Sequence, residues 1–241
     1  MESHTVHSRT ALIVLGMVLA CQLPGRADDA TDQYNIASGF YRMDRFEFAA
    51  EEYEKYLKDF PKHELVPEGL FFLGESYYHL NKLDMAREKY REVVARFAGA
   101  RNFHHALYRI GETSNLLSDF KSAEPALREF VAKRPDDMLV EFAMPHLGRA
   151  YLRNGKLAES KTTLLRALEK YPKGKLVDQC RFDLASTYEQ SGEKEAAAQL
   201  YLVLAHDPAS RYGDDALLAL GTQYFDDKKY EVAFDTFQDL G

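Results

Sequence analysis

Residues 67–98 read PEGLFFLGESYYHLNKLDMAREKYREVVARFA, and this pattern returns along the chain at a period of 37 residues, once 36. A small residue, Gly74, stands in the middle, with the aromatic Tyr77 three positions after it. A second small residue, Ala86, follows at twelve positions and a large one, Tyr90, at sixteen. The central small residue, here called the anchor, recurs at Ala37, Gly74, Gly111, Gly148, Ala185 and Gly221. A period of this length predicts a repeat array.

Each unit is predicted to be a pair of antiparallel helices, because apolar residues recur at three-and-four spacing on both sides of a short polar break. The breaks are Asp44-Arg45, Asn81-Lys82, Ser118-Asp119, Asn154-Gly155, Ser191-Gly192 and Asp227-Lys228-Lys229. The anchor and the alanine twelve residues later are expected to be small because the two helices cross closely there. A proline twenty-four positions after the anchor, such as Pro61, should end the second helix, although the second unit has Ala98 at that position.

The pattern resembles the tetratricopeptide repeat, whose leucine, glycine, tyrosine, alanine, phenylalanine and proline signature falls on the positions just described, with three extra residues in each loop. The resemblance covers residues 31–241. The units it defines are about 31–66, 67–103, 104–140, 141–177, 178–213 and 214–241, the last of them incomplete. It implies an all-α fold: a right-handed superhelical solenoid of about six helix-turn-helix repeats of 36–37 residues.

Two of the longer loops open with Phe-Pro or Tyr-Pro, at 60–61 and 171–172. In this they are similar to the bacterial envelope branch of the family, of the type of the Tol-Pal cell-division coordinator or the outer-membrane assembly lipoprotein. The chain contains no tryptophan, which is common in the first helix of the family's repeat, so its copies are diverged.

The first 27 residues have the layout of a secretory signal peptide: Arg9, an apolar stretch over 11–20, a polar segment, and small residues before a cut after Ala27. An uncut signal would instead anchor the protein, although an apolar core of ten residues is short for a membrane span. A third alternative is lipid attachment at Cys21, since residues 18–21 resemble a lipoprotein box. All three alternatives predict repeats outside the cytoplasm, in the periplasm or held at a membrane by the N-terminus.

Charge and cysteine content limit the classes of partner. The formal net charge is −7, and removing residues 1–27, with two arginines and one glutamate, takes it to −8. Without a basic run the chain is not expected to bind nucleic acid. The mature part would hold Cys180 as its only cysteine, which excludes an intramolecular disulfide within residues 28–241.

A search for catalytic or metal-binding motifs indicates no enzyme, no metal site and no cofactor. His104 and His105 are adjacent, so on a helix they point about 100° apart and cannot share one ion from the same face. No nucleophile motif or phosphate loop is recognisable. Carboxylate pairs such as Asp214-Asp215 fall near helix starts, where acidic side chains cap the helix.

The resemblance also implies a concave groove lined by the first helix of each unit. The candidate groove residues are Tyr34, Tyr41, Phe71, Glu75, Tyr78, Tyr108, Glu112, Arg149, Arg153 and Phe182. Aromatic side chains at helical spacing are usually buried, so some of them are expected to pack between hairpins. The remainder would suit an extended peptide or a helix of another protein.

Two hypotheses follow for function. The first is an exported scaffold that binds protein or peptide partners in the bacterial cell envelope through the groove. The second is the N-terminal recognition arm of a longer envelope protein or enzyme whose active domain lies beyond residue 241. The last unit has no polar capping helix after it, which suggests either that the chain is part of a longer polypeptide or that a partner or a second copy covers this end.

Overall fold

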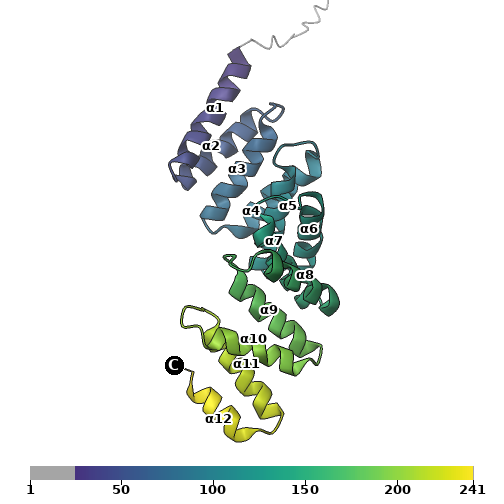
Figure 1. Cartoon of the computed structure of the whole chain (residues 1–241). Coiled ribbons are helices and arrows are strands. Elements are labelled where there is room, and N and C mark those ends of the chain that lie inside the picture. The colour runs from purple at the N-terminus through teal and green to yellow at the C-terminus, as the bar shows by residue number, and fades with distance from the viewer. Residues whose placement is uncertain (1–24, 241) are drawn as a thin grey trace, which may run out of the picture.

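The computed structural model describes residues 25–240, and within this range every regular element is an α-helix (Figure 1). The helices are α1 (Gly25–Arg42), α2 (Phe46–Asp59), α3 (Val66–His79), α4 (Leu83–Arg96), α5 (Phe103–Leu116), α6 (Phe120–Lys133), α7 (Val140–Arg153), α8 (Leu157–Lys170), α9 (Val177–Gln190), α10 (Lys194–Ala205), α11 (Gly213–Asp226) and α12 (Tyr230–Gln238). Consecutive odd and even helices form six hairpins. The predicted all-α repeat solenoid is confirmed.

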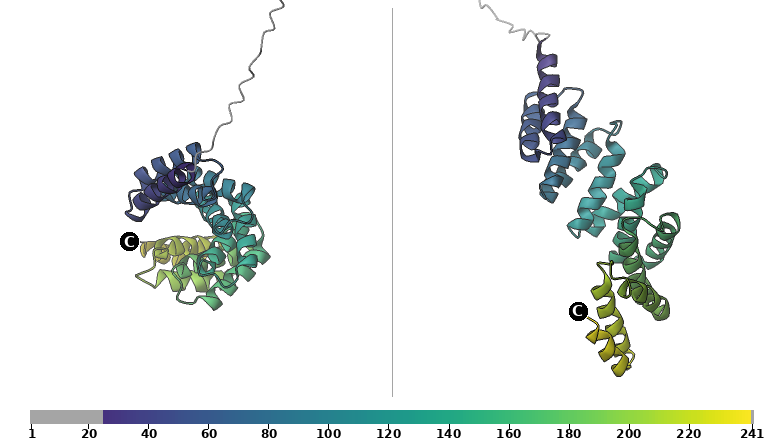
Figure 2. Two further views of the ribbon diagram at one scale, coloured as in Figure 1. Left: turned by 90° about the horizontal axis from the view of Figure 1, so that it is seen from above. Right: turned by 60° about the vertical axis from the view of Figure 1, so that its left-hand side comes forward.

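The hairpins stack in chain order into an open superhelix, which looks like a broken ring when seen from above (Figure 2). Each helix packs on the next one along the chain, and among the odd helices α1 contacts α3, α5 contacts α7, and α7 contacts α9. In residues 25–240 no two even-numbered helices contact each other to a similar extent. From α5 to α9 the odd helices therefore lie closer together than the even ones, on the inner side of the curve.

The glycine anchors lie where the two helices of a hairpin cross. A Cβ atom added to Gly74 would come within 2.6 Å of the Tyr90 ring, and one added to Gly111 would come within 2.2 Å of Leu127 Cγ. The side chain that excludes it is the one sixteen positions after the anchor, and the same holds for Gly148. The residue twelve positions on also touches the crossing, because Ser160 Oγ donates to the Gly148 carbonyl at 3.0 Å.

Each hairpin turn contains one residue in the left-handed backbone region, always seven positions after the anchor. Glycine occupies this position twice, at Gly155 and Gly192, and the four other turns use Asp44, Asn81, Ser118 and Lys228 with φ between 56° and 61°. These residues fall in the polar breaks that the sequence indicated. A left-handed conformation is unfavourable for residues other than glycine, asparagine and aspartate, so the turns at Ser118 and Lys228 store strain.

The second helices end where the pattern predicts, but proline is not the sole cause. Helices α2, α6 and α8 end two residues before a proline, and α4 ends at the equivalent Arg96 although Ala98 replaces the proline. The sequence pattern did not anticipate that Pro125 and Pro145 lie inside α6 and α7.

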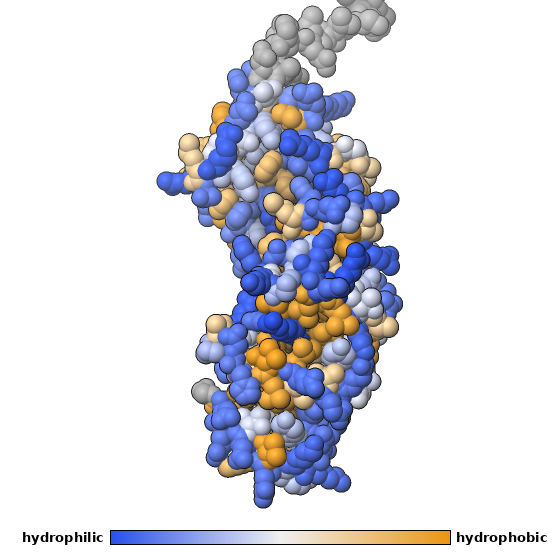
Figure 3. All heavy atoms as spheres, in the orientation of Figure 1, coloured by the Kyte–Doolittle hydropathy of each residue, from blue (hydrophilic) through white to orange (hydrophobic). Residues whose placement is uncertain are grey.

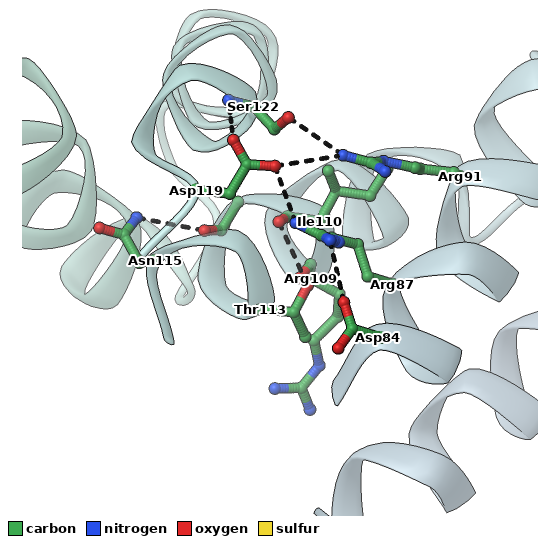
Figure 4. A network of polar contacts seen from close by, with 10 residues as sticks. Asp84, Arg87, Arg91, Arg109, Ile110, Thr113, Asn115, Asp119 and Ser122 are labelled. Atoms are coloured by element: carbon green, nitrogen blue, oxygen red, sulfur yellow. Dashed lines mark hydrogen bonds and ion pairs between the residues drawn. The ribbon is translucent and has the colours of Figure 1, made fainter. Parts of the chain in front are cut away.

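Ion pairs join consecutive even helices in the middle of the array (Figure 4). Arg87 of α4 donates to Asp119, the N-cap residue of α6, at 2.9 Å, and also to Asp84. We call such contacts even-helix pairs. The same two repeat positions hold three pairs, Arg87–Asp119, Glu124–Lys156 and Lys161–Glu193. The basic residue lies on the earlier of the two hairpins in the first pair, on the later one in the second pair, and on the earlier one in the third pair.

The predicted signal segment is placed only at its end. Cys21 and most of residues 1–27 lie outside the described residues, and Ala27 falls in the first turn of α1. None of the helices within residues 25–240 combines the length and apolar character needed to cross a bilayer.

Candidate partner-binding groove

A buried charge cluster lies on the inner side of the array, between α3 and α5. Arg109 donates from Nε and Nη2 to the two carboxylate oxygens of Glu75, at 2.8 and 2.7 Å, and from Nη1 to Glu112 at 2.6 Å. The Tyr90 hydroxyl donates to Glu75 at 2.6 Å, and the Tyr108 hydroxyl donates to Glu112 at 2.7 Å. Two carboxylates thus share one guanidinium, which leaves a net negative charge.

The cluster holds its charges despite burial. Burial alone would lower the pKa of Arg109, but the carboxylates of Glu75 and Glu112 raise it, so the guanidinium stays protonated. Its plane also lies over the Tyr78 ring, 4.7 Å from the centroid. Tyr78 is half-buried, so one face of this ring is fixed while its other atoms remain available at the surface.

A second pair of opposite polarity lies between α7 and α9. Arg149 Nε donates to both oxygens of Asp183, at 3.0 and 3.2 Å, and the Asp183 side chain is only 3% exposed. Burial raises the pKa of Asp183 to about 6, against the opposing effect of Arg149. We call Glu75–Arg109 and Arg149–Asp183 the odd-helix pairs, since both join the residue after one anchor to the residue two before the next.

Between the two pairs lie polar groups without a partner. Asn115 Nδ2 donates to the carbonyls of Gly111 and His146, at 3.1 and 3.2 Å, while Asn115 Oδ1 and His146 Nδ1 are buried and make no hydrogen bond. Burial, with a smaller effect of Arg149, lowers the pKa of His146 to about 4, so this imidazole is neutral. Neither residue is in the list of candidate groove residues, although the repeat register places Asn115 four after the anchor Gly111, at the groove position of Tyr41 and Tyr78.

The predicted groove residues divide by burial. Phe71, Glu75 and Tyr108 are buried, and the rings of Phe71 and Tyr108 pack against Tyr90 and Phe130, so they support the groove from below. The remaining seven are half-buried or exposed: Tyr34, Tyr41, Tyr78, Glu112, Arg149, Arg153 and Phe182. We call these seven the groove set. Their role in binding stays a prediction.

The polarity of the surface changes along the molecule. In the view of Figure 3, hydrophilic residues cover much of the upper part, while hydrophobic ones gather lower down, at the level of α7 to α11. A separate cleft of about 460 Å³ lies between α2, α3 and α4, with Leu57, Leu70 and Met85 among its lining residues. It includes no member of the groove set.

Two of the described histidines and the described cysteine have roles that the fold explains. In residues 25–240 no three His, Cys, Asp or Glu side chains converge as metal ligands would. His105 contacts Asp137 at 3.4 Å, and His63 contacts the Tyr56 hydroxyl at 2.8 Å. Cys180 is buried, and burial raises the pKa of its thiol to about 12, which makes it unreactive near neutral pH.

Helical hairpins with small anchors, left-handed turns and a lined inner curve define an α-solenoid repeat protein. A tetratricopeptide repeat model matches residues 34–101 and 146–214, which is more than half of the chain. The chain belongs to the tetratricopeptide repeat family. Proteins of this family are generally non-enzymatic scaffolds that bind proteins or peptides.

Solved structures share the fold at low sequence identity. YrrB, described as a protein with an unusual peptide-binding site, is 20% identical, with a TM-score of 0.62 over 72% of this chain and 84% of that one. MamA (residues 41 to the end) from Desulfovibrio magneticus RS-1 is 21% identical, with a TM-score of 0.61 over 73% and 93%. No curated protein sequence matches the chain.

Proposed function

We propose that this protein is an exported scaffold that binds a protein or peptide partner in the bacterial cell envelope, through the groove set on the inner side of the odd helices. The observation that carries the proposal is the combination of supported aromatic side chains with charges of both signs along that side. Tyr78 is held by Arg109, and Phe182 stacks on Tyr212 at 5.3 Å. Pre-positioned aromatics next to polar groups are typical of protein-binding surfaces.

The charge distribution supports a directional mode of binding. The Glu75–Arg109–Glu112 cluster carries a net negative charge, whereas α7 contributes Arg149 and Arg153, of which Arg149 pairs with Asp183. A partner segment with a basic end near α3–α5 and an acidic end near α7 would meet complementary charge at both ends.

The binding test uses variants that keep the Glu75–Arg109–Glu112 ion pairs. Tyr78→Ala with Arg153→Glu changes two members of the groove set, and Arg166→Glu, at an exposed position on α8, reverses the same charge outside it. Wild type and the Arg166 variant should capture the same partner from the native cell envelope after cross-linking, and the double variant should lose it. Equal capture by all three, with unchanged circular dichroism, would place binding elsewhere.

The envelope location is part of the proposal and rests on the layout of residues 1–27. Mass spectrometry of the N-terminus of the native protein distinguishes the alternatives for residues 1–27. A start at Asp28 indicates a cut signal, a lipidated Cys21 indicates a lipoprotein, and an intact Met1 in a cytosolic fraction would refute export.

A second candidate function is the recognition arm of a longer envelope protein or enzyme. The observation that favours it is the apolar outer face of the last hairpin, where Phe225, Tyr230 and Phe234 are exposed. The intact mass of the native protein decides between the two, because only this candidate requires a polypeptide much larger than the mature repeat segment.

A further inference from the structure

The last described hairpin, α11–α12, has an uncovered apolar face. Four side chains on it are each more than half exposed, namely Leu218, Phe225, Tyr230 and Phe234. In the five earlier hairpins the residues at the same repeat positions are all buried or half-buried, since the next hairpin packs over them. The uncovered face is therefore the surface that the array uses elsewhere to bind a helix.

The chemistry of this face differs from the middle of the array. At the position of Phe234, thirteen after the anchor, the second, third and fourth hairpins carry the charged Arg87, Glu124 and Lys161 of the even-helix pairs. The last hairpin has no charge there. Its occupant is thus selected by apolar and aromatic contact.

Only the first and last hairpins have aromatic side chains four, nine and sixteen positions after the anchor. The first has Tyr41, Phe46 and Tyr53, and the last has Phe225, Tyr230 and Phe237. The ring geometry in the two hairpins is also similar. Tyr41 and Phe46 meet edge to face at 5.6 Å and 67°, and Phe225 and Tyr230 meet at 5.3 Å and 65°.

In the first hairpin this aromatic set is covered by α3. The Phe72 ring lies 5.2 Å from Tyr41 and 6.3 Å from Tyr53, and His79 stacks on Phe46 at 4.1 Å. Phe72 and His79 are seven residues apart and share one face of the helix. An aromatic followed seven positions later by a histidine is therefore the pattern that covers such a set in this protein.

We propose that the α11–α12 face binds an amphipathic α-helix of a second protein, which presents an aromatic residue and, seven positions later, a histidine or another aromatic. This site includes no residue of the groove set. A second copy stacked head to tail offers a poorer match, because α1 has Asn35 and Arg42 at the corresponding positions.

The probe is a fluorescent peptide with the sequence of α3, residues 66–79, added to the purified protein and followed by fluorescence anisotropy. Binding should weaken by about tenfold in Phe234→Arg, and the Met138→Arg control, at an exposed position remote from this face, should bind as wild type does. A peptide with Phe72→Ala and His79→Ala should bind about tenfold more weakly to wild type.

Three results would overturn the proposal. One is an absence of peptide binding, or binding that Phe234→Arg does not weaken. Another is self-association in light scattering that Phe234→Arg abolishes, which would assign the face to a second copy. The last is a native polypeptide in which a further helix of its own already covers the face. The Tyr78→Ala, Arg153→Glu variant should bind the peptide as the wild type does. A failure of the groove proposal can therefore be told apart from a failure of the present one.

Discussion

At the scale of single residues, His146 is neutral and half-buried on the odd helix α7, and its Nδ1 atom is buried. Its pKa is lowered from 6.5 to about 4 in the folded protein, chiefly by burial. The unfolded chain therefore binds more protons between these values, so the neutral imidazole's contribution is present above pH 6.5 and lost as pH falls toward 4.

We expect His146→Gln to flatten the dependence of stability on pH. Between about pH 7 and pH 5 the free energy of unfolding of the wild type should fall by about 2 kcal/mol because of this residue. In the variant most of this decrease should be absent. Urea unfolding at both pH values measures it. His206→Gln, at an exposed position, should follow the wild-type profile, and an unchanged slope in His146→Gln would contradict the assigned role.

Adding side-chain volume at a glycine anchor should destabilise the hairpin, because its two helices cross there. Gly111→Ala places a methyl group against Leu127 Cγ, a branch point that cannot swing aside, so we expect a loss of about 2 kcal/mol despite alanine's higher helix propensity. Gly39→Ala in α1 meets no atom within 4 Å and should stabilise by up to about 1 kcal/mol. Thermal melts of the two variants should shift in opposite directions, and a shift of both in the same direction would refute the crossing argument.

At the scale of elements, the hairpin turn tests the strain in the left-handed positions. Ser118 has φ 58°, and glycine adopts this conformation without a steric penalty. Ser118→Gly should raise the free energy of unfolding by about 0.5–1 kcal/mol, after the entropy cost of glycine in the unfolded chain. Leu117→Gly, one residue earlier at φ −85°, should lower it, and the same sign for both would rule out strain as the cause.

The even-helix pairs test how strongly one hairpin is coupled to the next. Glu124 accepts from Lys156 Nζ at 2.5 Å and from Asn154 Nδ2 at 2.8 Å, and its side chain is 9% exposed. A double-mutant cycle of Glu124→Ala and Lys156→Ala should give a coupling energy of about 1 kcal/mol. The cycle of Glu124→Ala with Lys133→Ala, on the same helix, should be additive, and coupling of similar size there would indicate a general charge effect.

Much of the element level could be predicted from the sequence, because small anchors and polar breaks are local signals. The breaks contain every left-handed residue, such as Asn81 and Gly155. Long-range pairing was not readable in the same way. Glu75 and Arg109 are 34 residues apart, so the sequence proposed Glu75 as a partner contact, whereas the structure buries it under a guanidinium. A glutamate that binds a partner and a glutamate in a buried ion pair look the same in the sequence, and only the fold distinguishes them.

At the scale of the whole molecule, stability should vary along the array. The even-helix pairs occur at the three middle junctions. Among the described residues the junction of the first two hairpins has no ion pair, and the junction of the last two has one at other repeat positions, Lys194–Asp227. Repeat proteins unfold locally, since each unit contacts only its neighbours. Amide hydrogen exchange should thus be slowest in α5–α8 and fastest toward α11–α12. Equal protection throughout would mean that the array unfolds as one unit.

The alternating polarity of the ion pairs affects which repeat units the chain can lose during evolution. Tandem repeats are prone to lose a unit by unequal recombination. Loss of the fourth hairpin would bring Glu124 opposite Glu193, and Glu112 opposite Asp183, so both contacts would join like charges. Loss of the third would bring Arg87 opposite Lys156. Chains that had lost the third or the fourth unit would therefore have a less stable junction, so selection on folding would disfavour loss of these two units.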